Sequence, residues 1–560
     1  MSKRRGDDAQ FELPSAKRYR GGVTSPLDRL SSLSDELLLH VLSFLPISSL
    51  NVCQRLSHRF HTLAGDSELW KRQYYSQWVR PRARRLANVT RSSLPPRVEY
   101  TPKVSTWFDH SHLAEEGKAT NWKGQYRLRH NWSTGVCRVT EVELPHPPAP
   151  PVLVKLCAGV VFTADATHGL RAWCAKDPAY CLAKAPFPKQ PDEATVSPTA
   201  LAVSQLDDER EVVVGFDDGH FNRYVFDMET SQLRLRSSHI GFKDGAITAI
   251  ALSSPYLLIV SQHKSLSLYN LRVSSHVSEM TSEATKLRKL ASLNAANMVA
   301  PMTLSLRTSG PEIVATIVYS FFHIGCGWSL GIQELRFNQN GQQMESRLAS
   351  TVDSQYGTMQ SRARTASRMR RHSMGADPSD GTIAAAPVVP SIVHPHPPTS
   401  MSYSHPYLLT SHADNTLTMY LVVSDHHRIF VRGGQRLWGH TSSVSAVQVT
   451  NRGKAVSVSS RGDEIRIWEL EPAVRSLGSR QLLQEEKSIQ VNPENKDRDG
   501  SELESSPRSL RGDLSDSGLD TGVPEEVSVM HGCVGFDDER VLLLREKTVG
   551  TQLLECYDFT

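Results

Sequence analysis

The sequence lacks close cysteine pairs, long apolar runs and an apolar leader. None of its eight cysteines forms a Cys-x-x-Cys pair and most stand in apolar stretches, so we expect reduced core residues rather than disulfides or zinc ligands. The most apolar stretch, Ile313 to Trp328, is interrupted by polar residues and glycines and is too short for a membrane span. The chain opens Met-Ser-Lys-Arg-Arg rather than with a signal peptide. We therefore expect a soluble intracellular protein with no membrane partner.

The sequence also lacks a strong net charge and any familiar catalytic motif. A formal net charge of +4 over 560 residues argues against nucleic-acid binding by the whole chain. No phosphate loop, nucleophile elbow or zinc-protease motif occurs. The pairs His110-Ser111-His112 and His394-Pro395-His396 have no cysteine or acid at ligand spacing. We expect a protein that is not an enzyme and holds no cofactor or metal.

The length and the shifts in composition predict at least two domains. The boundaries suggest a disordered basic tail at 1–26, a helical segment at 27–78, a basic linker with a helix at 79–135, and a strand-rich region at 136–560. In the tail, Lys3-Arg4-Arg5 and Lys17-Arg18 have the spacing of a bipartite nuclear import signal, although a solvated tail explains them equally well. We expect the protein in nucleus and cytoplasm.

Residues 30–78 carry apolar residues at helical spacing. The first helix is expected to begin after Ser34, with Asp35 and Glu36 in its first turn, and to stop at Pro46. Its apolar stripe contains Leu33, Leu37, Leu38, Val41, Leu42 and Leu45.

Two further helices are expected in the same segment. Ser48 or Ser49 would cap the second, which ends at Gly65 and has the stripe Leu50, Cys53, Leu56, Phe60 and Leu63. Asp66 would cap a short third helix that carries Leu69, Trp70 and Tyr74. Three short helices in under about fifty residues bury too little surface to be stable alone, so we expect this segment to bind a partner.

The remainder of the chain predicts a repeating all-β structure. A first strand is expected at Val136–Leu144 and is followed by a proline-rich hinge. One pattern recurs: an aromatic residue preceded three positions earlier by an apolar residue. It occurs at Trp173, Tyr224, Tyr269, Tyr420, Trp468 and Tyr557. The intervals between close neighbours are 51, 45 and 48 residues. This is the length of a propeller blade. The six aromatic residues mark six blades, and the long interval from Tyr269 to Tyr420 leaves room for one more, supplied by strands at Ile313–Phe322 and Ser329–Phe337. We therefore expect seven blades, with disordered insertions at about 340–400 and 474–525.

The helical segment resembles the F-box. The resemblance covers the whole motif and is carried by Leu33-Ser34-Asp35-Glu36-Leu37-Leu38, Leu42-Ser43-Phe44-Leu45-Pro46, Leu56-Ser57-His58-Arg59-Phe60 and Asp66-Ser67-Glu68-Leu69-Trp70. Two departures are Ser34, where the family usually has proline, and Leu56-Ser57, where Val-Cys is common.

The strand-rich region is similar to WD repeats of a degenerate kind. The clearest blade runs from Gly439-His440 to Trp468-Glu469. In such repeats an aspartate six residues before the tryptophan bonds the histidine, but here that position is Gly462 and Asp463 comes one residue late.

The order of segments is similar to that of F-box/WD-repeat proteins. The resemblance implies an α+β multidomain protein, with an N-terminal three-helix F-box followed by an all-β, seven-bladed WD40-like propeller. It also implies a substrate-recognition adaptor of an SCF ubiquitin ligase, with a Skp1-like adaptor, a cullin and a protein substrate as partners. The expected Skp1 contacts are Leu33, Leu37, Leu38, Val41, Leu42, Leu45, Pro46, Leu50, Leu56, Phe60, Leu63 and Trp70.

Weaker patterns suggest further sites. Arg171 and Arg466 each lie two residues before a repeat tryptophan and would suit an acidic or phosphorylated target, although solvated strand positions explain them too. Short basophilic and Asp-Ser-Gly patterns mark Ser367, Ser373 and Ser517 as candidate phosphorylation sites.

Two alternatives to a ligase adaptor stay open. One alternative is a propeller scaffold that binds Skp1 outside any ligase. The other is an RNA-associated propeller that uses the basic run Arg80–Lys103. A solvated linker explains that run better, so nucleic acid is not an expected partner.

Overall fold

The computed structural model describes residues 30, 32–80, 120–144, 152–176, 180–187, 196–206, 209–239, 245–272, 288–294, 299–353, 392–425, 428–460, 464–470, 488–493, 528–546 and 552–560. These residues divide into two compact units, one ending at Tyr126 and the other beginning at Arg127. No helix in the described ranges is long and apolar enough to cross a membrane.

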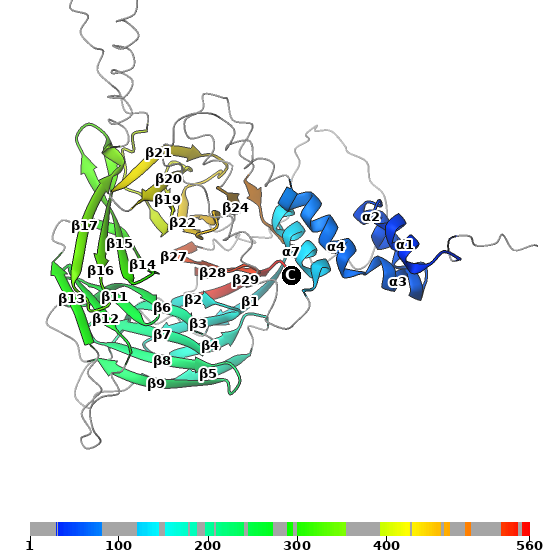
Figure 1. Ribbon diagram of the computed structural model, residues 1–560. Helices are drawn as coiled ribbons and strands as arrows, with labels where there is room; N and C mark the ends of the chain where they lie inside the picture. Colours follow the sequence, from blue (N-terminus) through cyan, green and yellow to red (C-terminus); the bar gives the residue numbers. More distant parts are fainter. Residues whose placement is uncertain are drawn as a thin grey trace, which may run out of the picture. The chain divides into compact units, whose positions relative to one another are not determined.

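The first unit is built from short helices (Figure 1). They are α1 (Asp35–Leu42), α2 (Ile47–Cys53), α3 (His58–Ala64), α4 (Ser67–Tyr74), the π-helix η1 (Tyr75–Val79) and the first part of α7 (Trp122–Thr134). Their common core consists of the buried residues Leu38, Leu42, Leu50, Leu63, Ala64 and Leu69.

The helix boundaries correct the expectation in two places. The expected second helix is two helices, because the chain turns after Cys53 and Ser57 then caps α3 by accepting the Phe60 N–H at 3.2 Å. The helix before that turn begins at Ile47 directly after Pro46, rather than after Ser48 or Ser49. Asp66 caps α4 as predicted, accepting the Glu68 N–H at 2.9 Å.

The second unit contains seven sheets, which Figure 1 shows arranged in a ring. Six are blades of four antiparallel strands that follow one another in the sequence. Blades 1 to 3 are β2 (Leu153–Cys157), β3 (Val160–Asp165), β4 (Gly169–Cys174) and β5 (Cys181–Ala185); β6 (Pro198–Leu206), β7 (Glu209–Phe216), β8 (Phe221–Asp227) and β9 (Gln232–His239); and β10 (Ile247–Ser253), β11 (Tyr256–Ser261), β12 (Ser265–Asn270) and β13 (Arg288–Asn294).

Blades 4 to 6 repeat the same order of strands. They are β14 (Val299–Ser309), β15 (Glu312–His323), β16 (Gly327–Phe337) and β17 (Gln343–Ser350); β18 (Ser400–Ser404), β19 (Tyr407–Ser411), β20 (Leu417–Ser424) and β21 (Ile429–Leu437); and β22 (Val444–Val449), β23 (Lys454–Ser459), β24 (Ile465–Glu469) and β25 (Ile489–Gln490).

Blade 7 closes the ring with strands from distant parts of the sequence. Its strands β27 (Ser528–Phe536), β28 (Arg540–Glu546) and β29 (Gln552–Asp558) are completed by β1 (Val136–Leu144), which pairs antiparallel to β29. A fifth strand, β26 (Asn492–Pro493), pairs parallel to the start of β1. The predicted seven-bladed propeller is therefore confirmed, and β1 has the predicted bounds.

The recurring aromatic residues occupy the third strand of six blades. Each ring packs within an apolar cluster of the propeller, either in its core or at its edge, which explains the recurrence at blade length. In blade 4 the ring comes instead from Tyr319 on the second strand, opposite Gly331, where a side chain would collide with it. Blade 4 also has the longest described strands, with 11, 12 and 11 residues in β14, β15 and β16.

The expected insertions lie mostly outside the described residues. Residues 354–391, 471–487 and 494–527 are not described, but β17 fills the beginning of the first expected insertion, at residues 343–350. The prediction of an insertion from about residue 340 is therefore wrong at its start, because blade 4 still needs its fourth strand there.

The second part of α7 packs on blades 6 and 7. Trp132 stacks on Phe559 at 4.1 Å between ring centroids and donates its indole N–H to the Asp538 carbonyl at 2.8 Å. Asn131 donates to the Phe559 carbonyl at 2.8 Å. The Nζ of Lys454 lies 3.7 Å from the centre of the Trp132 ring, and burial lowers the pKa of this amine to about 7. These contacts anchor the strand β1 that closes the ring.

Candidate functional site

The start of α1 is held by an arginine from α3. The Arg59 guanidinium contacts the Asp35 carboxylate at 2.7 Å and the Leu33 carbonyl at 2.6 Å. Both side chains of the ion pair are partly exposed, so the pair contributes at most about 1 kcal/mol of stability. Its effect is to orient helix α1, which carries the exposed Leu37 and Val41.

Helix α1 has two apolar stripes rather than one. Leu38 and Leu42 point into the helical core and are almost fully buried. Leu37 and Val41 lie at i and i+4 on the neighbouring face and are exposed, and the exposed Phe44 continues this spacing in the turn just after the helix. An ordinary surface helix has one apolar stripe, which is buried against the rest of its own unit. The second stripe is available to another molecule.

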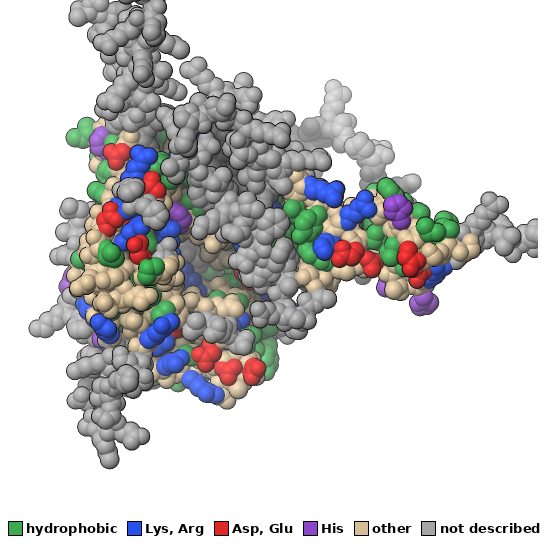
Figure 2. Space-filling view, in the orientation of Figure 1, with side chains coloured by type: hydrophobic (Ala, Val, Ile, Leu, Met, Phe, Trp, Pro, Cys, Tyr) green, Lys and Arg blue, Asp and Glu red, His purple; other side chains and the backbone are tan. Residues whose placement is uncertain are grey.

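Exposed apolar side chains continue beyond α1. Val52 in α2 and Leu56 in the turn that follows are also exposed. We call Leu37, Val41, Phe44, Val52 and Leu56 the apolar set, whose members are 44% to 69% exposed. Figure 2 shows hydrophobic side chains on the surface over α1 and α2. Several large exposed apolar residues on so small a unit are typical of a protein-interaction site.

The structure separates the twelve expected Skp1 contacts by burial. Leu37, Val41 and Leu56 are exposed, and Pro46 is exposed at the start of α2. The other eight expected contacts line or support the core, so the expectation that they are exposed to a partner is wrong. Adjacent residues of a helix face different neighbours, and only some of them face outward. The eight are Leu33, Leu38, Leu42, Leu45, Leu50, Phe60, Leu63 and Trp70.

Phe44 and Val52 were missed by the sequence reasoning. The spacing Leu37, Val41, Phe44 was a usable signal, since it forms a second stripe beside the first.

A cluster of aromatic rings fills the other end of the helical unit. Trp70 is buried, donates to the Ala64 carbonyl at 2.9 Å, and meets Tyr126 edge-on at 5.6 Å. Trp78 lies 4.6 Å from the same ring, whose hydroxyl donates to Gln77. Burial raises the pKa of Tyr126. Trp70 is therefore a structural residue that joins α4 to α7, not an exposed contact.

The propeller keeps the internal bonds of a WD repeat in blade 6. His440 Nε2 lies 2.6 Å from the Ser457 hydroxyl, which also accepts the Trp468 indole N–H at 2.7 Å. The carboxylate comes from Glu464, 3.3 Å from His440 Nδ1 and bonded to the Thr441 N–H at 2.9 Å. A glutamate placed two residues later replaces the aspartate expected near Gly462.

The electrostatics of Glu464 suit this structural role. Burial opposes its ionisation, but hydrogen bonds from Thr441 and Arg466 outweigh burial and hold its pKa below the ordinary value. The carboxylate is therefore charged at neutral pH and orders the blade edge.

Arg171 and Arg466 do not form an exposed cationic patch. Arg171 is 4% exposed, contacts Asp165 at 2.7 Å and lies over the Trp173 ring. Arg466 contacts Glu464 at 2.5 Å and donates to Ser488 at 2.7 Å. The prediction of target-binding arginines is wrong at both positions, because acids on the same blades pair with them.

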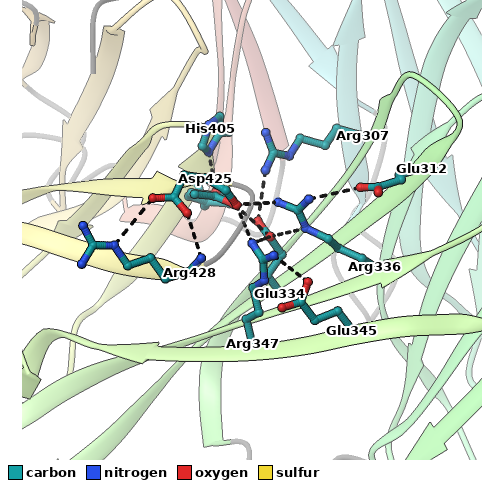
Figure 3. Close-up of polar contacts among 11 residues, drawn as sticks. Arg307, Glu312, Glu334, Arg336, Glu345, Arg347, His405, Asp425 and Arg428 are labelled. Atoms are coloured by element: carbon teal, nitrogen blue, oxygen red, sulfur yellow. Dashed lines mark hydrogen bonds and ion pairs between the residues drawn. The ribbon is translucent and has the colours of Figure 1, made fainter. Parts of the chain in front are cut away.

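A charged network joins blades 4 and 5 (Figure 3). Glu334 is fully buried and is bonded by Arg307 and Arg336, both at 3.0 Å. Arg336 and Arg347 also donate to the Asp425 carbonyl of blade 5, at 3.2 and 2.5 Å. Removing one of these donors would lower the stability of the fold, because a buried carboxylate would lose part of its charge compensation. The network locks two neighbouring blades together.

Other sequence candidates have no site in the described residues. Ser367, Ser373 and Ser517, the His110-Ser111-His112 pair and most of the basic run Arg80–Lys103 lie outside the described residues. His394 is buried and stacks on His412 at 3.8 Å. Within the described ranges, no three metal-ligating side chains come together.

Comparison with known families matches both parts of the chain. The family model described as F-box protein pof12 beta-propeller matches residues 137–560, and an F-box-like model matches residues 30–76. These two matches cover the propeller and the helical unit that holds the apolar set.

Individual relatives match most of the chain or a short part of it. The chain is 23% identical over 458 residues to F-box protein pof12 of Schizosaccharomyces pombe (strain 972 / ATCC 24843), covering 79% of this chain and 84% of that protein. It is 45% identical over 47 residues to F-box protein dre-1 of Caenorhabditis elegans, covering 8% of this chain and 5% of that protein. Among solved structures, the WD40 beta propeller domain of Doa1 aligns at 10% identity with a TM-score of 0.34, covering 75% of this chain and 95% of that chain.

Proposed function

The chain belongs to the F-box protein pof12 β-propeller family, and from this premise we propose that it is the substrate-recognition subunit of an SCF ubiquitin ligase. Its F-box binds a Skp1-like adaptor and through it a cullin, and its propeller binds the protein that is marked for degradation. The observation that carries the proposal is the apolar set on the F-box-like helices. We propose nucleus and cytoplasm as its location.

The apolar set supplies the free energy of the proposed Skp1 contact. Burying apolar surface contributes about 25 cal/mol per Å², and a standard stable interface buries about 1,600 Å² in total. Aromatic residues are enriched in interfaces, and the residues that contribute most cluster near the interface centre. Phe44 is the most exposed member of the set and is the leading candidate for that role.

The propeller supplies a rigid surface for the target. The Glu334 network and the His440–Ser457–Trp468 bonds hold neighbouring strands and blades in fixed positions. A rigid surface loses less conformational entropy on binding. We propose that this subunit performs no chemical step itself, and that ubiquitin transfer is accelerated because the target is held near the ligase's conjugating enzyme.

A pull-down with surface variants tests the proposal. Leu37→Glu combined with Leu56→Glu places charges in the apolar set without entering the core, whereas a charge at the buried Leu38 would unfold the helices. The matched control is Met228→Glu, an exposed apolar residue of the propeller. We expect the wild type and the control to recover Skp1 and a cullin, and the double variant to recover neither.

Other outcomes identify the alternatives. Recovery of Skp1 without a cullin would favour a scaffold outside any ligase. Recovery of neither protein by the wild type, together with RNA that is released by salt, would favour the RNA-associated propeller. Undiminished recovery of Skp1 by the double variant would contradict the role given to the apolar set.

A further inference from the structure

The fourth strand of blade 4 ends its sheet. Strand β17 pairs with β16 on one side, and among the described strands no other one pairs with its outer side. Its eight residues extend over about 26 Å at the usual rise per residue, with a register shift near its start that leaves Met344 between the paired residues Gln343 and Glu345. An outer strand of this length is a template for pairing with another chain unless charges, bulges or a cover prevent it.

One face of β17 is apolar and exposed. Met344 and Leu348 are 63% and 66% exposed, and strand alternation places them on the same face with Ser346 between them. Ser346 lies opposite Leu335, a member of the core between blades 3 and 4, so this face continues that core outward. No charged residue stands in this row.

The charges of β17 are on its other face. Arg347 is buried, pairs with Glu345 at 2.5 Å and donates to the Asp425 carbonyl of blade 5. These contacts fix the register and orientation of the strand from behind. The apolar row is thus presented on a strand that cannot easily turn over.

The outer strands of three other blades are protected. On β9, Arg234 and Arg236 flank the exposed Leu235. On blade 6, β25 has only two residues. On blade 7, β1 already has the additional parallel strand β26. This last pairing, over two residues of the same chain, adds a strand to an outer edge of the propeller.

We propose that β17 receives an extended, uncharged segment of the captured target protein as an added strand, with apolar side chains of that segment over Met344 and Leu348. The inference rests on the proposed function, since it concerns the target of the same propeller. Main-chain hydrogen bonds give such a contact its affinity, and alternate side chains give it specificity.

The size of the edge favours a peptide segment over a second copy of the chain. One strand of eight residues offers less than the roughly 1,200 Å² that stable protein pairs bury at the lower end. The contact therefore suits a weak, reversible association with one extended segment.

A peptide probe tests the inference on the purified full chain in complex with its Skp1-like partner. The probe is a fluorescein-labelled peptide of alternating threonine and valine with a lysine at each end, and binding is followed by fluorescence anisotropy. A second probe has the same side chains but methylated backbone nitrogens, which removes the donors needed for strand pairing. We expect the first probe to bind and the second not to bind.

Variants on two strands give the matched comparison. Met344→Lys with Leu348→Lys charges the apolar row and should weaken binding of the first probe at least about tenfold, because charged edges resist strand addition. Leu235→Lys on β9 changes an exposed residue of the same kind and should leave binding unchanged. Circular dichroism and thermal unfolding check that each variant is folded.

Three results would overturn the inference. Equal binding of the two probes would exclude strand pairing and needs no variant. Unchanged binding of the first probe by the variant that carries both Met344→Lys and Leu348→Lys would move the contact elsewhere. A concentration-dependent dimer in sedimentation that the same double variant dissolves would assign the edge to a second copy. Recovery of the Skp1-like partner, measured in the same samples, separates a failure here from a failure of the proposed function.

Discussion

Replacing Phe44 by alanine should weaken binding of the Skp1-like partner while the helical unit stays folded. Phe44 lies just beyond α1 and is 69% exposed. Its ring meets His40 edge-on at 5.0 Å, and the Arg72 guanidinium lies 5.9 Å from its centre. It is not part of the helical core. Its loss therefore removes surface offered to a partner.

The expected magnitude follows from the exposed area. A phenylalanine side chain buries about 150–250 Å² when fully enclosed, so an exposed fraction of 69% leaves about 100–170 Å² to be covered by a partner. At about 25 cal/mol per Å² this corresponds to about 2.5–4 kcal/mol. Since 1.4 kcal/mol is a factor of ten, the dissociation constant should rise by a factor of about 60 to 1,000.

Calorimetry and urea unfolding together test this prediction. Titration of the purified Skp1-like adaptor into wild type and Phe44→Ala measures the change in affinity. Urea unfolding should show a change in stability within about 0.5 kcal/mol for this surface residue. Leu42→Ala is the contrasting variant, because Leu42 is 2% exposed in the core and its truncation should cost about 2–5 kcal/mol.

One result would refute the reasoning. If Phe44→Ala binds the adaptor with an affinity within about twofold of the wild type, while Leu42→Ala shows the expected loss of stability, the second stripe of α1 is not the interface. The exposed apolar set would then need another partner.

Three further predictions concern the propeller. Ser457→Ala should lower the free energy of unfolding by about 1–3 kcal/mol, because two buried groups lose their partner, and an unchanged urea midpoint would contradict this. Trp132→Ala should cost about 3–5 kcal/mol by removing the stack on Phe559, whereas Trp132→Phe should restore part of it. Burial lowers the pKa of His394 to about 4 and that of His412 to about 3. As the pH drops, these histidines therefore take up protons in the unfolded chain before they do so in the folded one. The free energy of unfolding should fall as the pH drops from about 6.5 toward 4. Unfolding measured across this range should show a flatter pH dependence for His394→Asn, and an unaltered slope would exclude this histidine.

Local sequence signals predicted the helical unit well in some places. Ser34 and Asp66 were identified as the residues before α1 and α4, and both helices begin there. The break between α2 and α3 was missed, because apolar spacing continues through the turn and conceals it. Only the Ser57 side chain, which accepts the Phe60 N–H, marks the new helix start. A continuous stripe does not require a continuous helix.

The propeller was predictable from its period, but its contacts were not. The intervals between aromatic residues gave seven blades, since each blade repeats the same strand pattern. Glu464 could not be assigned to the His440 bonds, because the longer glutamate side chain reaches the histidine from a position that the repeat pattern does not mark. Arg171 and Arg466 were expected to be available to a target, yet acids on the same blades pair with both, and Arg171 is buried.

The sequence by itself determined the order of the two parts, the number of blades and the presence of an apolar helical segment, because these depend on spacing along the chain. Only the tertiary structure decided which of the leucines serve the core and which remain outside. Leu37 and Leu38 are adjacent in sequence and equal in chemistry, but one is exposed and the other is buried. Their difference comes from the angle at which α1 meets its neighbours, a property of the packed helices and not of either residue.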